Sequence, residues 1–213
     1  PPAILIGTPG RIADHLRKFT FITRGIKTMV LDEFDKSLEV GFEKEMKEIM
    51  EALPHVEQKI LTSATQKTPI PPFIKLNNPQ KINYLTSSTS QLTIKNVVAQ
   101  GNKLTTLIDL LGHIKNGCGI IFCNFKDSIQ TVSEHLNDRD VDHGCFYGGL
   151  LQTQRERALL KFRNGTHRLL LATDLAARGI DVPEMDFIIH YETPMKPDEF
   201  IHRNGRTARM NST

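Results

Sequence analysis

The sequence lacks the features that mark membrane, secreted and disulfide-rich proteins. No apolar run approaches the ~18 residues that a membrane-spanning helix needs. The N-terminus also lacks the basic-then-apolar layout of a secretory signal. Only three cysteines occur, in apolar surroundings and without the paired spacing of a metal site, which predicts reduced thiols in a protein core. Together these absences predict a cytoplasmic protein.

Charge of one sign is not in large excess either. The chain has 27 Lys and Arg residues against 24 Asp and Glu residues, which gives a net charge of +3 and a pI of about 8.8. This mildly basic balance permits nucleic-acid binding but does not require it. A hydrophobic content of 39% and a charged content of 24% are ordinary for a globular protein that buries a core. A length of 213 residues favours one large domain or two small ones.

Both ends of the sequence are abrupt. It begins at Pro1 without an initiator Met, runs directly into a strand pattern, and stops four residues after Arg209. We therefore expect a fragment of a longer protein with both ends missing.

Short apolar runs alternate with helical patterns along the chain. Strands are predicted at 3–7, 28–32, 59–62, 81–85, 97–100, 119–124, 144–147, 168–172 and 186–191. Helices are predicted at 10–18, 37–53, 102–114, 126–136, 152–163 and 197–203. Several strands are continuously apolar, as expected when both faces of a sheet are covered. This order predicts an α/β fold with parallel sheets and helices on both faces.

The composition changes near the middle of the chain. Residues 77–95 contain Ser87-Ser88-Thr89-Ser90 and few large apolar groups, which predicts an inter-domain linker. A surface loop within one domain is the alternative. We place the first domain at 1–80, the linker at 81–95 and the second domain at 96–213.

Acidic residues follow the predicted strand at 28–32. Asp32 and Glu33 stand at its carboxyl end, the edge where open α/β sheets bind ligands. An aspartate there could hold Mg²⁺ directly or through water, and the adjacent glutamate could orient or deprotonate an attacking water. Alternatively, these residues and Asp35 simply favour the N-terminus of the next helix. Ser63-Ala64-Thr65 also ends a strand, where hydroxyl groups could bridge strand edges or cap a helix.

Two further segments combine strand ends with phosphate-binding chemistry. Thr8-Pro9-Gly10-Arg11 links a strand to a helix, where free amides and Arg11 could attract phosphate; taken alone, the segment fits a simple turn with Pro near the first helical position better. The segment 172–181 offers Thr173 to a phosphate, Gly179 for close backbone approach and Asp181 to a ribose hydroxyl. A capped helix with a glycine stop is the alternative interpretation.

The chain ends in a basic segment. His202, Arg203, Arg206 and Arg209 crowd around one glycine after a strand-and-helix pattern. Arginines on a short element can neutralise charge on a transferring phosphoryl group. A solvated basic loop is the alternative.

In this order, the polar segments resemble the motifs of the DEAD-box branch of superfamily 2 RNA helicases, over nearly the whole chain. The matching motifs are the RNA-backbone motif at 8–11, the Walker B box at 32–35, the coupling motif at 63–65, motif IV at 120–124, the QxxR pair Gln152 and Arg155, motif V at 172–181 and motif VI at 202–209.

The resemblance implies two RecA-like domains, the first of them partial here, with ATP bound between them and RNA across both. On the nucleotide side it implies that Asp32 ligates Mg²⁺, possibly through water, and that Glu33 polarises the attacking water. It further implies that Asp35 meets His202, and that Ser63 and Thr65 couple the two activities. The arginine fingers and the remaining nucleotide contacts are implied to be Arg206, Arg209, Gly179 and Asp181.

On the RNA side, the resemblance implies contacts that are mostly to the sugar-phosphate backbone and therefore largely independent of sequence. The residues implied are Thr8, Gly10, Arg11, Gln152, Arg155 and Thr173.

The sequence also departs from the family. Phe34 stands where alanine is usual in the acidic box, Tyr147-Gly148-Gly149 replaces His-Gly-Asp, and Ala208 replaces a glycine. No segment matches the phosphate loop Gly-x-x-x-x-Gly-Lys-Ser/Thr, and the adenine-reading segment is missing too. We therefore expect the parent protein to hydrolyse ATP and remodel RNA, and these residues alone to be inactive.

Two other functions remain open from the sequence. One is a non-catalytic RNA-binding module, because the second domain is complete in its motifs. The other is a DNA-directed translocase of superfamily 2, which shares the sheet and the arginine fingers. The acidic box with Ser-Ala-Thr and the final motif favour RNA, by resemblance.

Overall fold

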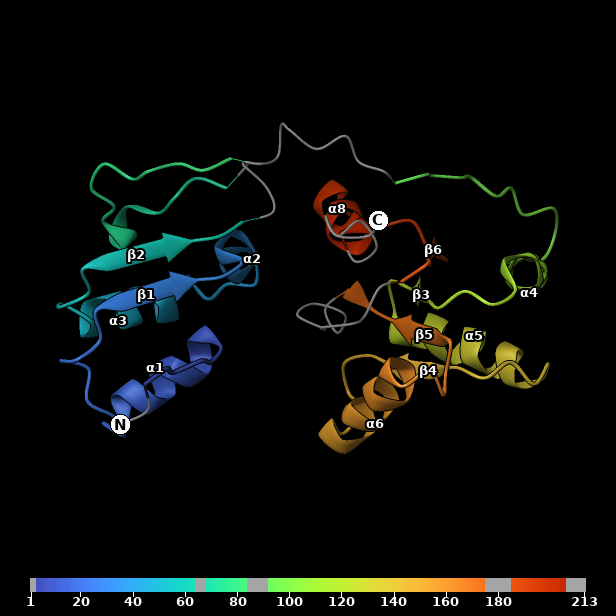
Figure 1. Cartoon of the computed structure of the whole chain (residues 1–213), viewed down its shortest axis with the longest axis horizontal. Helices are drawn as coiled ribbons and strands as arrows, with labels where there is room; N and C mark the ends of the chain where they lie inside the picture. The colour runs from blue at the N-terminus through green and yellow to red at the C-terminus, as the bar shows by residue number, and fades with distance from the viewer. Residues whose placement is uncertain (1–2, 64–67, 84–91, 175–184, 206–213) are drawn as a thin grey trace. The chain divides into compact units, whose positions relative to one another are not determined.

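The chain folds into two compact units, residues 1–88 and 89–213, in the computed structural model (Figure 1). The structure describes residues 3–63, 68–83, 92–174 and 185–205. Much of the linker predicted at 81–95 lies outside these ranges, so its boundaries stay a prediction.

The first unit is built on a two-stranded parallel sheet. Its elements are α1 (Pro9–Arg17), β1 (Thr28–Leu31), α2 (Phe34–Glu39), α3 (Glu43–Ala52), β2 (Gln58–Leu61) and the short 3-10 helix η1 (Pro72–Ile74). β1 pairs with β2 from Thr28 opposite Gln58 to Leu31 opposite Leu61.

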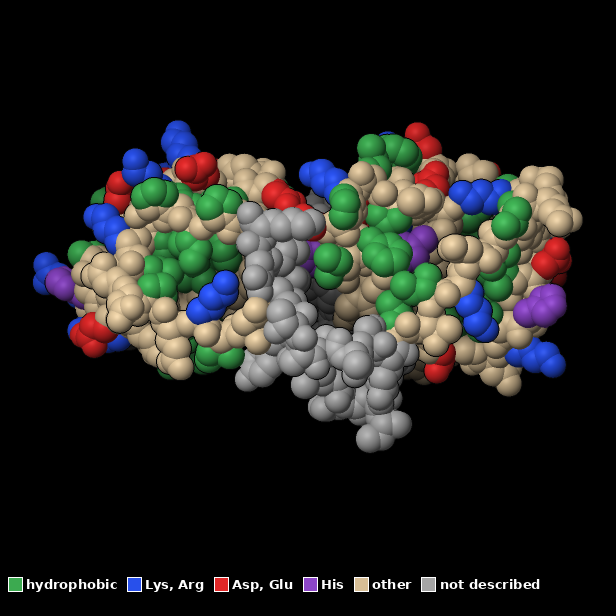
Figure 2. Space-filling model, turned by 90° about the horizontal axis from the view of Figure 1, so that it is seen from above, with side chains coloured by type: hydrophobic (Ala, Val, Ile, Leu, Met, Phe, Trp, Pro, Cys, Tyr) green, Lys and Arg blue, Asp and Glu red, His purple; other side chains and the backbone are tan. Residues whose placement is uncertain are grey.

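Helices α1 and α3 cover one face of this sheet. Ala13 of α1 and Ile49 of α3 pack with Met29 of β1 in one apolar cluster, and Figure 1 shows both helices on the same side of the strands. On the opposite face, Val30 is 56% exposed and its neighbour Ile60 is 41% exposed. The space-filling view accordingly shows apolar side chains gathered at the surface of this unit (Figure 2).

The second unit contains a four-stranded parallel sheet in the order β4-β5-β3-β6. Its elements are α4 (Lys103–Ile114), β3 (Gly119–Phe122), α5 (Lys126–Asn137), β4 (Gly144–Phe146), α6 (Gln152–Arg163), β5 (Leu169–Ala172), β6 (Phe187–His190) and α8 (Pro197–Asn204). The backbones of β3 and β6 approach closely at Gly119, where an added Cβ would lie 2.6 Å from the carbonyl oxygen of Phe187.

Alternate residues of the buried strands face two separate cores. Ile121 and Leu171 pack with α4 and α5 on one face, whereas Ile120, Leu170 and Phe162 of α6 form the core on the other face. Every residue of β3 and β5 is buried, which explains why these strands are continuously apolar. The predicted α/β fold with parallel sheets is thereby confirmed.

Three predicted elements differ from the structure. The helix predicted at 37–53 is two helices, because Gly41 adopts a φ of 93° that breaks the helical path between α2 and α3. The strands predicted at 3–7 and 97–100 are not formed. No described strand pairs with either segment, and their apolar side chains are exposed, with Ile6 at 88% and Val98 at 80%.

Replacing Leu171 by Ala tests the core of the second unit. Leu171 is fully buried, so we expect a loss of about 2–5 kcal/mol in the free energy of unfolding, measured by urea titration. The matched control is Leu160→Ala on α6, where the side chain is 64% exposed and the expected change is within ~0.5 kcal/mol. Equal losses for the two variants would contradict this assignment of the core.

Candidate functional site

In the first unit, the end of β1 is tied to the end of β2 by Thr62. The Thr62 amide donates to the Leu31 carbonyl at 3.0 Å, which extends the parallel pairing by one step. The Thr62 hydroxyl then donates to Oδ1 of Asp32 and accepts the amide of Glu33 at 3.2 Å. Thr62 therefore fixes the backbone and side chain of the acidic pair. This role of Thr62 was not predicted from the sequence. The available signal was that Thr62 directly precedes Ser63 at the end of a predicted strand.

The acidic box turns sharply after the strand. Glu33 adopts the left-handed conformation, with φ 47° and ψ 48°, and is followed directly by α2. This turn leaves Asp32 exposed and buries Phe34 and Asp35, which are 6% and 1% exposed. The large side chain of Phe34 is thus accommodated inside the unit while Asp32 stays accessible at the strand end.

The buried face of α2 also carries a cation. Lys36 is 4% exposed, and its ammonium group lies 2.7 Å from the carboxylate of Glu39 one turn later. This pairing compensates the cost of burying the charge beside the acidic box.

At the start of α1, Thr8 acts through its backbone. The amides of Arg11 and Ile12 both donate to the Thr8 carbonyl at 3.0 Å, and Pro9 occupies the first helical position. The side chains of Thr8 and Arg11 are exposed, while Gly10 is half-buried. The Thr8 carbonyl and Pro9 therefore serve to begin the helix. The predicted RNA contacts of Thr8, Gly10 and Arg11 stay a prediction.

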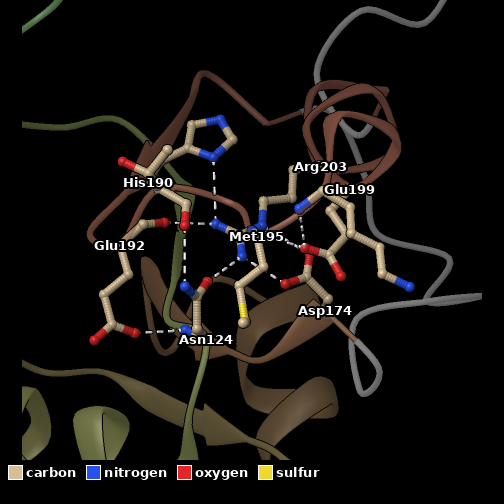
Figure 3. A network of polar contacts seen from close by, with 9 residues as sticks. Asn124, Asp174, His190, Glu192, Met195, Glu199 and Arg203 are labelled. Carbon is tan, nitrogen blue, oxygen red and sulfur yellow. Dashed lines mark hydrogen bonds and ion pairs between the residues drawn. The ribbon is translucent and has the colours of Figure 1, made fainter.

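In the second unit, a buried arginine connects three strand ends. The guanidinium of Arg203, from α8, donates to both carboxylate oxygens of Asp174 at 2.7 and 2.5 Å. It also donates to Oδ1 of Asn124 at 2.7 Å and to the carbonyl of Glu192 at 2.8 Å (Figure 3). The Arg203 side chain is 1% exposed, so this is an internal network.

A second layer of contacts holds the network in place. The Glu192 carboxylate accepts the amide of Asn124 at 2.6 Å and the hydroxyl of Ser128 at 2.7 Å. α8 itself is started by Pro197 and by Glu199, whose carboxylate accepts the amide of Lys196 at 3.1 Å. Asn124, Asp174 and Arg203 lie in segments that the sequence matched to family motifs, but no individual role was predicted for them.

An aromatic stack lies beside Arg203. The ring of His190 stacks on Phe200 at 5.1 Å and on Phe122 at 6.4 Å between centroids. Its Nε2 lies 3.0 Å from the Asn204 side-chain oxygen, and its Nδ1 lies 3.4 Å from Nη1 of Arg203. These contacts suit a neutral ring that donates through Nε2 and accepts through Nδ1. Burial lowers the pKa of His190, and the nearby charge of Arg203 acts in the same direction.

The thiol next to Asn124 is also controlled by burial. Cys123 is fully buried, and burial raises the pKa of its thiol to about 12, with the Glu192 carboxylate adding to the effect. The thiol is therefore a packing group, as the sequence predicts.

Of the other predicted site residues of both units, some are described by the structure and some lie outside the described ranges. Gln152 begins α6 and is exposed, and Arg155 lies one turn later and is half-buried. Thr173 directly follows β5, its amide 3.4 Å from the Phe146 carbonyl at the end of β4. His202 lies in α8. Thr65, Gly179, Asp181, Arg206 and Arg209 fall outside the described residues, while Ser63 is described and half-buried.

The electrostatic surface is mixed. Figure 2 shows basic and acidic side chains interspersed over the visible face of each unit. In the described part of the chain, no three His, Cys, Asp or Glu side chains are grouped so that they could hold a metal ion by themselves. No helix there is long and apolar enough to span a bilayer.

Comparison with known protein families shows which family the chain belongs to. Residues 102–211 match the family described as Helicase conserved C-terminal domain, and residues 2–71 match the family described as DEAD/DEAH box helicase. The chain belongs to the DEAD-box helicase family.

Individual relatives of this helicase chain agree with the assignment. ATP-dependent RNA helicase DbpA of Bacillus subtilis is 33% identical over 97% of this chain and 44% of its own length. Eukaryotic initiation factor 4A of Dictyostelium discoideum is 32% identical over 97% of this chain and 53% of its own length. A solved structure of a Dbp5 variant from S. cerevisiae, bound to RNA and ADP BeF3, superposes with a TM-score of 0.80 at 25% identity, covering 96% of this chain and 56% of that one. The chain thus spans about half the length of these helicases.

The half-buried His190 predicts a pH-dependent stability for this DEAD-box chain. Because its pKa is lowered from the ordinary 6.5 in the folded state, the unfolded chain takes up a proton first as the pH falls. The free energy of unfolding should therefore be retained above about pH 6.5 and decline below it. Urea titrations between about pH 7 and pH 5 measure this decline.

His190→Gln should make the decline shallower, whereas His113→Gln, at an exposed position of α4, should leave it unchanged. An identical pH dependence in the wild-type chain and in His190→Gln would show that burial of this ring is not the cause.

Proposed function

We propose that this chain forms part of an ATP-dependent RNA helicase, which unwinds or remodels RNA using ATP hydrolysis. The observation that carries the proposal is the acidic pair Asp32–Glu33, held at the carboxyl end of β1 by Thr62 in a chain of the DEAD-box family. The activity is assigned to the whole protein, because the chain spans about half the length of its helicase relatives.

The nucleotide side of the proposal rests on the chemistry of the strand end in the first unit. Asp32 is exposed, and its carboxylate is the hard oxygen ligand that Mg²⁺ prefers. Mg²⁺ usually binds through one or two carboxylates together with substrate phosphates, so a single accessible aspartate fits this ion. Glu33 would orient and deprotonate the attacking water. When bound, Mg²⁺ would neutralise charge on the transferring phosphoryl group.

The other nucleotide contacts are proposed from the family motifs. We assign Asp35 and His202 to catalysis, Ser63 and Thr65 to coupling, Gly179 and Asp181 to the nucleotide, and Arg206 and Arg209 to the developing phosphoryl charge.

The RNA side of the proposal uses exposed and half-buried residues of both units. Gln152 and Arg155 lie one turn apart at the start of α6, and Thr173 lies at the carboxyl end of the adjacent β5. Thr8, Gly10 and Arg11 contribute from the start of α1. Because the visible surface carries basic and acidic side chains side by side, we expect local contacts to the RNA backbone and not binding across one broad basic surface (Figure 2).

The names of the relatives favour RNA helicase activity over the two alternatives. DbpA is named an ATP-dependent RNA helicase, and the Dbp5 variant structure contains RNA and ADP BeF3. A non-catalytic RNA-binding module would bind RNA without any nucleotide dependence. A DNA-directed translocase would prefer DNA over RNA of the same sequence.

These 213 residues alone should not turn over ATP. Their sequence contains no glycine-lysine phosphate loop, so the β- and γ-phosphates lack the backbone amides and lysine that usually hold them. Phosphate release should stay at the level of the buffer, with or without RNA. Robust RNA-stimulated hydrolysis by the pure chain would contradict this prediction.

A chimera tests the enzyme itself. Replacing the matching region of DbpA by this chain should preserve RNA-stimulated ATP hydrolysis, and Glu33→Gln in the chimera should lower kcat by about 10²-fold or more while nucleotide still binds. Glu43→Gln, at an exposed glutamate of α3, is the matched control and should leave kcat unchanged.

RNA and DNA of the same sequence are compared as activators of the chimera. Preferential stimulation by DNA would favour the translocase. Unchanged hydrolysis after Glu33→Gln would remove the acidic pair from the mechanism.

A further inference from the structure

Three side chains occupy equivalent positions at the carboxyl edge of the second sheet. β3 ends at Phe122, which pairs with Ala172 of β5 and with His190 of β6. Asn124, Asp174 and Glu192 each follow the last residue of their strand by two positions. The parallel register therefore brings three polar residues, from distant parts of the sequence, to the same level of the sheet edge.

Arg203 contacts all three positions. It forms a two-pronged ion pair with Asp174, donates to the Asn124 side chain, and donates to the Glu192 carbonyl. Its guanidinium also lies 5.0 Å above the ring of Phe122, the last residue of β3. One side chain of α8 thus contacts the segments that follow β3, β5 and β6 (Figure 3).

This geometry requires arginine rather than any cation. A planar guanidinium presents five donors in a fixed fork, which can serve a carboxylate with two parallel bonds and other acceptors beside it. A lysine keeps the charge but places its donors on a single nitrogen atom. With three donors on one nitrogen, it could not reproduce the two parallel bonds to Asp174 together with the bonds to Asn124 and Glu192.

The ion pair between Arg203 and Asp174 lies next to a residue proposed to contact RNA. Asp174 is 17% exposed and directly follows Thr173, the residue proposed to donate to the RNA backbone. Arg203 itself is 1% exposed and cannot reach RNA. Any effect of Arg203 on RNA binding must therefore pass through the segments that it holds.

We propose that Arg203 is a positioning residue for RNA binding, which fixes the strand end at Thr173–Asp174 against α8 in the geometry that the RNA backbone requires. The proposal deepens the proposed function and rests on it. In this proposal the buried Arg203 contributes to RNA affinity by holding the residues that contact the RNA.

The test is Arg203→Lys in the full 213-residue chain, with a fluorescein-labelled oligouridine as the probe. The dissociation constant, measured by anisotropy, should rise about tenfold because the Asp174 fork is lost. The salt dependence of binding should keep its slope, since that slope counts the cations that meet phosphates and Arg203 is not one of them.

Arg168→Lys is the matched control. Arg168 immediately precedes β5, at the opposite end of the strand from Asp174, and donates to the carbonyl of Lys115. The same chemical change at the amino edge of the same sheet should leave the RNA affinity within about twofold of the wild type, because no proposed RNA contact lies there.

Two measurements separate positioning from loss of the fold. Circular dichroism identifies conditions in which each variant is fully folded, and binding is compared only there. Nitrogen-resolved NMR of His190 reports on the network without RNA, because Nδ1 accepts from Arg203 in the wild type and should change its shift in Arg203→Lys. If that variant does not fold, Asp174→Asn weakens the same fork from the other side and should raise the dissociation constant in the same way.

The outcomes distinguish this proposal from the function on which it rests. Wild-type affinity in folded Arg203→Lys or Asp174→Asn overturns the positioning role alone. An equal loss in Arg168→Lys also overturns it, because the effect would then be general. No binding of oligouridine by the wild-type chain overturns both the RNA assignment and the positioning role.

Discussion

In-register parallel pairing is the constraint on which the rest of the second unit depends. β3 pairs with β5 and with β6 so that Phe122, Ala172 and His190 end their strands at one level. The polar residues Asn124, Asp174 and Glu192, which follow these strand ends by two positions, therefore share one edge of the sheet. A shift of one residue in either pair would turn alternate side chains to the wrong core and move one acceptor away from Arg203.

Arg203 and Lys36 are tolerated in the interior because each has a partner of opposite charge. Arg203 would be costly in the interior by itself, yet the Asp174 carboxylate meets two of its nitrogens and neutral oxygens meet the others. Lys36 follows the same rule on a smaller scale through Glu39. In both units these pairs lie where a strand end passes into the polar segment that the family motifs occupy. The polar interior therefore specifies geometry more than it adds stability.

Much of the fold could be predicted from the sequence because local patterns determined it. The helix predicted at 152–163 matches α6, and the continuous apolar runs became the fully buried β3 and β5. The periodicity around Gly41 suggested one long helix, since apolar residues recur on both sides of the break and only the positive φ separates them. The runs at 3–7 and 97–100 have strand-like composition, but composition does not supply a neighbouring strand.

The candidate site was predictable in its motifs but not in its supporting contacts. The acidic box was assigned from its place after an apolar run. Thr62 and the network of Arg203 were missed because their partners are far apart in the chain: 30 residues separate Thr62 from Asp32, and 79 separate Arg203 from Asn124. A single sequence gives no measure of which distant polar residues will meet. Burial of an arginine is also unexpected, because such side chains are usually exposed.

Cys123 has a consequence for how this sheet edge would fare in an oxidising environment. Peroxides attack the thiolate form of cysteine, and a thiol with a pKa of about 12 holds almost none of it at neutral pH. Burial of Cys123 and its raised pKa therefore disfavour oxidation of the sulfur immediately before Asn124.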